Sequence, residues 1–240
     1  MIRISFDNVK RNFKLLLEKI QAIYWFINMR LYLSSYRLGN KPEKLTALFG
    51  EGRRVGIILN ARDNAMPEFR GESLIKQTAI LKGIGLEGQE IDLRNFKNAE
   101  AIRAELLKYN GLWIPGGNSF LLRRAMYDSG FDKVISEILK NSDFVYAGYS
   151  AAAVILGKTM RGIELVDNPN AVKEIYGTEP IWEGLNILPY TIVPHYKSNH
   201  PESADVEKEV AFYDKEKMPY KTLRDGEAVV INGESEEIVG

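Results

Sequence analysis

The amino-acid sequence predicts an α/β fold, a three-layer α/β/α sandwich around a mostly parallel central sheet. From Met29 onward, short apolar runs alternate with segments of helical periodicity. Two of these runs end in turns of small residues, at Gly116-Gly117 and at Gly148-Tyr-Ser150, and a helical segment follows each turn. Alternating strands and helices form parallel sheets that helices cover on both faces. The carboxyl ends of such strands share one rim, where ligands bind.

The elements expected within this sandwich follow in chain order. The apolar runs predict strands at residues 31–34, 55–59, 90–93, 112–114 and 144–147, the third being the weakest. Helical periodicity predicts helices at residues 71–82, 98–107, from about 119, and 131–139. Turn formers dominate residues 157–180, which predicts a long excursion over the rim. Then come a strand ending at His195, a helix over 202–213, and a hairpin-like pair of strands, 221–224 and 228–232, around Asp225-Gly226.

Composition excludes several classes of protein. The formal net charge of the 240 residues is zero, so no strong field attracts nucleic acid or an anionic membrane. The chain has no cysteine, which excludes disulfides, thiolate zinc sites and a cysteine nucleophile. Its two histidines are His195 and His200, so any histidine base is one of these. We expect no metal and no cofactor.

The first 28 residues differ from the rest of the chain. Apolar residues at roughly helical spacing, with basic residues among them, predict a helical extension over residues 1–28 ahead of one domain over residues 29–240. The apolar part is too short and too interrupted to span a bilayer, and it lacks the cleavage site of a secretory signal. A docking helix and a membrane-surface helix are the alternatives. We expect the extension to be dispensable.

Ser150 stands in the segment that indicates chemistry most directly. A strand-like run ends at Gly148, Ser150 follows, and small residues open a helix, as in a nucleophile elbow. Free N–H groups at that helix start favour an oxyanion. The usual pattern is G-x-S-x-G, but its last position here is Ala152. The alternative is an ordinary buried strand-to-helix junction.

A serine nucleophile needs a base and an orienting acid. His195 follows a strand-like run and comes after Ser150, the order expected of an elbow nucleophile. The candidate acids between the two are Glu164, Asp167, Glu174, Glu179 and Glu183, and spacing does not choose among them. Backbone N–H groups of Gly116-Gly117-Asn118 could complete an oxyanion hole, or the segment could be a turn capped by Asn118 or Ser119.

Three segments carry a resemblance to a known family. Trp113–Phe120, the Tyr-Ala-Gly-Tyr-Ser-Ala elbow and Leu188–Tyr196 look like the corresponding parts of the peptidase E family, which includes aspartyl dipeptidases and cyanophycinases. These are serine peptidases on a class I glutamine amidotransferase-like, flavodoxin-like fold. The resemblance covers roughly Met29 to Asn232 and keeps the three segments in order.

The resemblance implies a role for each matching residue. Ser150 would be the nucleophile, His195 the base, and Gly117 and Ala151 the oxyanion donors, with Gly116 and Asn118 on the substrate side. The family's third member is expected shortly after the elbow helix, where Leu165 stands. Glu164 is the nearest acid and Asp167 the next, and we expect Glu164. The family's substrate-binding arginine has no counterpart in Pro201–Asp205, so we expect no preference for aspartyl peptides.

The expected function is that of a cytoplasmic serine peptidase, a dipeptidase or an aminopeptidase-like hydrolase, acting on short peptides through a Ser-His-Glu or Ser-His-Asp triad. A catalytically weak or inactive amidotransferase-like binding module is the main alternative, and a membrane-surface protein is a weaker one. The expected partner is a short peptide. We expect neither nucleic-acid binding nor stable membrane insertion, and we leave a homodimer open.

Overall fold

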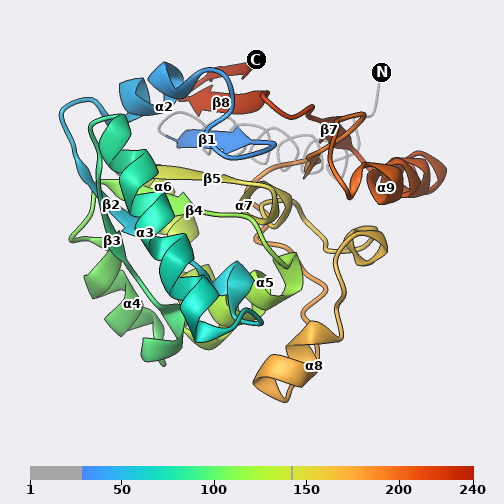
Figure 1. Cartoon of the computed structure of the whole chain (residues 1–240), viewed down its shortest axis with the longest axis horizontal. Coiled ribbons are helices and arrows are strands. Elements are labelled where there is room, and N and C mark those ends of the chain that lie inside the picture. Colours follow the sequence, from blue (N-terminus) through green and yellow to red (C-terminus); the bar gives the residue numbers. More distant parts are fainter. Residues whose placement is uncertain (1–28, 142) are drawn as a thin grey trace, which may run out of the picture.

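The fold is a seven-stranded, mostly parallel sheet between two layers of helices (Figure 1). The computed structural model describes residues 29–141 and 143–240, so the expected extension over residues 1–28 lies outside the described residues. The strand order is β3-β2-β4-β5-β1-β8-β9, and the first five of these are parallel. Their bounds are β3 Glu87–Glu90, β2 Arg54–Ile57, β4 Gly111–Ile114, β5 Val145–Tyr149 and β1 Arg30–Ser34.

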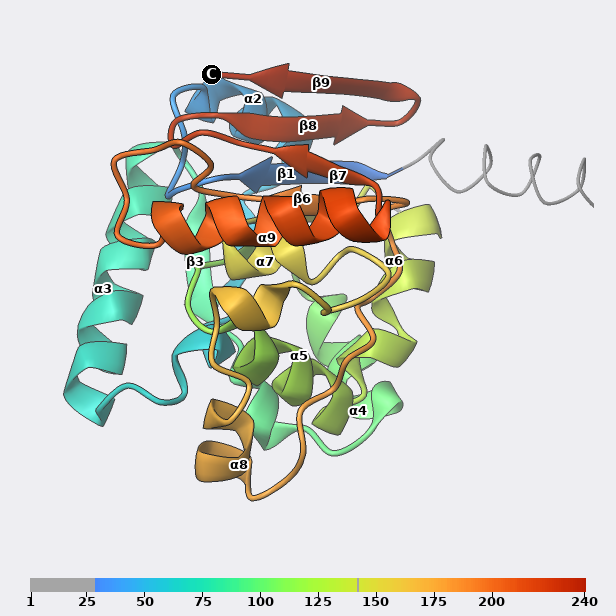
Figure 2. The ribbon, with the colours of Figure 1, turned by 90° about the vertical axis from the view of Figure 1, so that its right-hand side faces the viewer.

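The last two strands are antiparallel to their neighbours. β8 (Ala228–Asn232) pairs with β1, and β9 (Ser235–Val239) then forms the sheet edge beside β8. A separate small sheet joins β6 (Thr191–Val193) and β7 (Tyr220–Thr222) in parallel. Figure 2 shows this small sheet beside α9 (Ser203–Glu216), whose Val206, Val210 and Tyr213 pack with Val193.

The three expected layers follow from alternation of side chains along the strands. In β1, Tyr32 points to the face covered by α2 (Pro42–Phe49) and α3 (Pro67–Gly83). Leu31 and Leu33 belong to the opposite core, which also holds buried side chains of α4 (Ala99–Leu106), α5 (Ser119–Asp128), α6 (Ile135–Asn141) and α7 (Ala151–Val154). The predicted α/β/α sandwich is confirmed.

Several predicted elements differ in the structure. β3 ends at Glu90, because the Asp92 side chain accepts a hydrogen bond from the Arg94 N–H and starts a 3-10 turn, η2 (Leu93–Asn95). The predicted helix over 131–139 is divided at Val134 into a 3-10 turn, η3 (Phe131–Lys133), and α6. The excursion over 157–180 contains a 3-10 turn, η4 (Ile163–Leu165), and a helix, α8 (Ala171–Tyr176).

The predicted hairpin around Asp225-Gly226 is wrong. β7 pairs with β6 in the small sheet, whereas β8 pairs with β1 in the main sheet. Between β7 and β8 the chain crosses from the small sheet to the main sheet. The crossing segment is hydrogen-bonded to the loop after β1, where the Asn40 N–H donates to the Gly226 carbonyl and the Ser35 N–H donates to the Glu227 carbonyl. α2 and β9 were not predicted. Among the described helices, none has the length and apolar character needed to cross a bilayer.

Candidate active site

Ser150 occupies a strained turn between β5 and α7. Its backbone has φ of 52° and ψ of −112°, an uncommon conformation for a residue with a side chain. Gly148 makes room for the turn, because a Cβ there would lie 2.6 Å from the Ala152 Cβ and even closer to the Ile114 carbonyl oxygen. With no side chain at Gly148, alanine fits at position 152, which accounts for the missing last glycine of the pattern.

The Gly116-Gly117 turn at the end of β4 lies directly against Ser150. A Cβ built on Gly116 would come within 2.9 Å of the Ser150 Cβ. Among the described residues, the backbone N–H groups of Gly117 and Ala151 have no hydrogen-bond acceptor, whereas the next N–H, of Asn118, donates to the Ala61 carbonyl. Two free donors therefore flank the serine, as an oxyanion hole requires.

Asn118 has a structural role in addition to any contact with substrate. Its Oδ1 accepts a hydrogen bond from the Leu121 N–H and caps α5, and its Nδ2 donates to the Asn168 carbonyl. Both ends of the amide are thus engaged. The expected turn cap and the expected free N–H at Gly117 occur together.

His195 follows β6 and is almost fully buried, with a positive φ of 60°. Its backbone N–H donates to Ser35 Oγ at 2.8 Å, and its Nδ1 lies 2.7 Å from Asp225 Oδ1. A carboxylate only accepts hydrogen bonds, so the contact assigns the proton to Nδ1 and leaves Nε2 as an acceptor. Burial lowers the pKa of His195, and Asp225 partly opposes this shift.

Asp225 is itself held in place. Its Oδ1 also accepts a hydrogen bond from Ser35 Oγ at 2.8 Å, and its backbone N–H donates to Ser198 Oγ at 2.8 Å. Ser35, the residue after β1, therefore contacts both the His195 backbone and the Asp225 carboxylate. This shared contact fixes the histidine and its acid relative to the main sheet.

Neither acid expected to orient His195 contacts it. Glu164 accepts a hydrogen bond from the Gly162 N–H in its own turn, and Asp167 accepts one from the Ser119 N–H at the start of α5. The physical reason is that residues 162–167 fold as a turn against α5 and α9, away from the loop after β7. Sequence reasoning missed Asp225 because it searched only between Ser150 and His195. The available signal was an acid directly after a second strand-like run.

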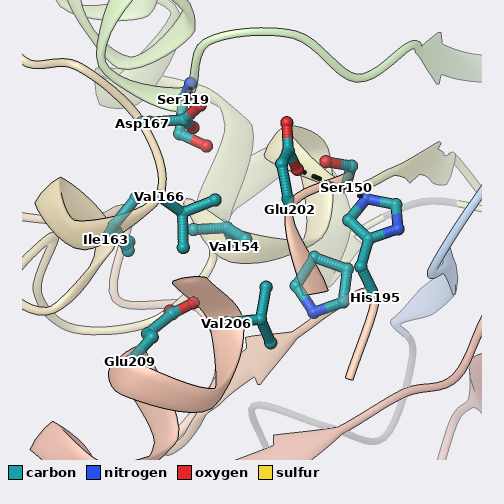
Figure 3. A pocket seen from close by; sticks show the side chains of 11 residues that line it. Ser119, Ser150, Val154, Ile163, Val166, Asp167, His195, Glu202, Val206 and Glu209 are labelled. Atoms are coloured by element: carbon teal, nitrogen blue, oxygen red, sulfur yellow. Dashed lines mark hydrogen bonds and ion pairs between the residues drawn. The ribbon is translucent and has the colours of Figure 1, made fainter. Parts of the chain in front are cut away.

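Ser150 and His195 face one narrow pocket (Figure 3). Apolar walls come from Val154, Ile163, Val166 and Val206, and Asp167, Glu202 and Glu209 add carboxyl groups. Burial raises the pKa of Asp167 to about 6 and that of Glu209 to about 8. Among the described residues, Ser150 Oγ and His195 form no hydrogen bond, an arrangement common in active sites without substrate.

His200 stacks on His195, with ring centroids 3.7 Å apart and planes 9° apart. In the described part of the chain, His195, His200 and Glu202 lie close enough to be considered as metal ligands. One ring nitrogen of each histidine and one carboxylate oxygen of Glu202 all lie within 4.8 Å of one another. Imidazole binds metal in the plane of its ring. The two parallel ring planes cannot meet at one ion, so this arrangement does not form a metal site without rotation of a ring.

Comparisons with known proteins identify the family. Residues 71–239 match the model of peptidase family S51. An uncharacterized peptidase of Listeria innocua is 29% identical over 154 residues, which cover 64% of this chain and 70% of that protein. Peptidase E of Streptomyces coelicolor is 26% identical, with 65% of this chain and 63% of that protein covered.

A solved structure is also similar to this chain. It is the 1.5 Å crystal structure of a protein assigned as a peptidase E from Listeria monocytogenes, and it superposes with a TM-score of 0.70 at 25% identity. The match covers 88% of this chain and 98% of that one. The family model spans well over half of the chain, and the chain therefore belongs to peptidase family S51, a family of serine-type peptidases.

Proposed function

We propose that this peptidase hydrolyses short peptides through a triad of Ser150, His195 and Asp225. Ser150 Oγ attacks the scissile carbonyl and passes its proton to His195 Nε2, while Asp225 stabilises the resulting imidazolium through Nδ1. The N–H groups of Gly117 and Ala151 stabilise the oxyanion of the tetrahedral intermediate. His195 then protonates the leaving amine, and water hydrolyses the acyl-enzyme by the same steps in reverse order.

The observation that carries this proposal is the pairing of a strained serine with a carboxylate-bound histidine in one pocket. Strain at Ser150 is expected of a side chain that must be held outward. A lowered pKa keeps His195 neutral at pH 7, which a general base needs.

The pocket also bears on the substrate. Among the described residues, its lining includes the carboxyl groups of Asp167, Glu202 and Glu209 and no lysine or arginine. An acidic substrate side chain would find no basic partner there, and a buried unpaired carboxylate is strongly disfavoured. We therefore propose short peptides without an aspartyl preference as substrates.

A fluorophosphonate probe tests the mechanism, because it labels a serine only when the serine is activated. We expect the parent to be labelled and Ser150→Ala to remain unlabelled. Ser150→Ala should also lose peptide hydrolysis by about four to six orders of magnitude. Ser119→Ala is the matched control, since Ser119 is the other serine of the pocket. Labelling of Ser150→Ala, or activity within tenfold of the parent, would exclude this nucleophile.

A further inference from the structure

Arg62 lies behind the oxyanion hole and contacts both strands that build it. It ends the 3-10 turn η1 (Asn60–Arg62), which follows β2. Its Nε donates to the Gly116 carbonyl at 2.7 Å, its Nη1 to Ser73 Oγ at 2.9 Å and its Nη2 to the Tyr149 hydroxyl at 3.2 Å. One guanidinium thus joins the turn after β4 to the residue just before Ser150.

The bond to the Gly116 carbonyl fixes the direction of the next N–H. The described chain contains no cis peptide, and in a trans peptide the C=O and the following N–H point in opposite directions. Because the Gly116 C=O points at Arg62, the Gly117 N–H points away from it. This N–H has no acceptor among the described residues, and the turn packs against Ser150.

Ala61, the residue before Arg62, also contacts this turn. Its carbonyl accepts the Asn118 N–H at 2.8 Å, and a Cβ on Gly117 would collide with that carbonyl oxygen. Gly117 has φ of 156°. η1 thus contacts the turn at the Gly116 carbonyl and at the Asn118 N–H, whereas the Gly117 N–H between them has no acceptor among the described residues.

The Tyr149 end of the contact is fixed as well. The Tyr149 hydroxyl also lies 3.4 Å from Gln77 Nε2, and Gln77 Oε1 accepts a hydrogen bond from Trp113 Nε1 at 2.8 Å. Trp113 belongs to β4 and Tyr149 to β5, the two neighbouring strands whose ends carry Gly117 and Ser150. The hydrogen bonds of Arg62 are thus part of a network that fixes both strand ends.

We propose that Arg62 is a positioning residue that holds the Gly116–Gly117 peptide with its N–H toward the oxyanion. The proposal rests on the proposed function, because an oxyanion hole has a use only if Ser150 attacks a carbonyl. Glycine pairs rotate easily, so without its partner the peptide can turn. A turned peptide would present a carbonyl oxygen to the oxyanion and repel it. Lysine cannot replace the three-way contact, since it lacks the planar fork.

The test compares Arg62→Met and Arg62→Lys with Arg123→Met under saturating fluorophosphonate labelling. Arg123 is a buried arginine whose Nε also donates to a carbonyl, that of Glu183, but it is not among the residues that line the Ser150 pocket. Labelling yields kinact, which depends on the oxyanion hole, and KI, which reports initial binding. We expect Arg62→Met to lower kinact about 10²–10³-fold with little change in KI, the size of effect of losing one oxyanion donor.

The other variants separate positioning from folding. Arg62→Lys should lower kinact by about tenfold, and Arg123→Met should lower the melting temperature but leave kinact near that of the parent. The acid limb of the pH profile should stay in place in both Arg62 variants, because His195 and Asp225 are untouched. If Arg62→Met does not fold, the kinact of Arg62→Lys decides between the proposal and its failure.

An unchanged kinact in the folded Arg62 variants would overturn the proposal, as would an equal loss in Arg123→Met. In both cases Ser150 would still be labelled in the parent, so the proposed function would stand. A parent that is not labelled would overturn the proposed function and this proposal with it.

Discussion

The candidate active site has two halves, one at the end of the main sheet and one at the end of the two-stranded sheet, and both are built at the ends of neighbouring parallel strands. Ser150 and Gly117 follow β5 and β4, neighbouring parallel strands of the main sheet. His195 and Asp225 follow β6 and β7, neighbouring parallel strands of the two-stranded sheet. In each half, functional groups from distant parts of the sequence meet because adjacent parallel strands end together. In the main-sheet half Gly117 is exposed and Ser150 is half-buried, whereas His195 in the small-sheet half is almost fully buried and is held by Ser35, the residue after β1.

The largest effect should come from the histidine of the small-sheet half. His195→Gln should lower kcat/KM for any accepted peptide by at least about 10⁴-fold, because it removes the base of the proposed triad. His200→Gln should keep activity within about tenfold, because His200 stacks on the His195 ring and lies beside Glu202 and Tyr36 but has no place in the proposed triad. Parallel steady-state assays check this. If His200→Gln is the inactive variant, the assignment of the base is reversed.

The acid of that half should have the next largest effect. Asp225→Asn should lower kcat by about 10³–10⁴-fold, because an amide can favour the wrong tautomer of His195. Asp225 raises the pKa of His195, so its loss should move the acid limb of the residual pH profile to lower pH. Glu164→Gln is the control, and its kcat and acid limb should match the parent. Equal losses in both variants would return Glu164 to the candidate triad.

A substitution of Glu209, one of the three carboxyl residues that line the pocket, tests how burial of this group affects stability. Folded Glu209 keeps its proton to about pH 8, whereas its ordinary pKa is 4.5, so stability falls as pH rises between these values. Glu209→Gln should therefore raise the free energy of unfolding by a few kcal/mol at pH 8 and change it little at pH 4. The exposed Glu207→Gln on the same helix should have no effect. Thermal unfolding at the two pH values measures both.

The smallest effect concerns the main-sheet half. Ala152→Gly restores the usual elbow pattern and should leave kcat unchanged, because Gly148 already provides the room that the turn needs. It should cost about 1 kcal/mol of stability through the lower helix propensity of glycine, which corresponds to a fall of about 2–4 °C in melting temperature. A gain of tenfold or more in kcat would mean that Ala152 does restrict the elbow.

The same contrast explains how much the sequence could predict. Ser150 and Gly117 could be proposed from the sequence because each lies in a short run of small residues directly after an apolar strand, a local signal. Strands β1, β2, β4 and β5 were found within one to two residues of their bounds for the same reason. Asp225 was not predicted, because its contact with His195 depends on the pairing of β7 with β6, about thirty residues earlier. The Asp-Gly dipeptide that follows β7 is a strong local signal for a hairpin, and tertiary pairing overrode it.

The pairing of β1 with β8 sets an order in which this enzyme can become active. Leu31 pairs with Ile231, so the open edge of β1 is covered only after nearly all of the domain has been synthesised. Such non-local pairing slows folding, because the loop must close before any contact is gained. Asp225 lies just before β8, and its hydrogen bond from Ser35 ties it to the end of β1. We therefore expect the contact of Asp225 with Ser35, and with it the orientation of His195, to form only when β8 docks on β1.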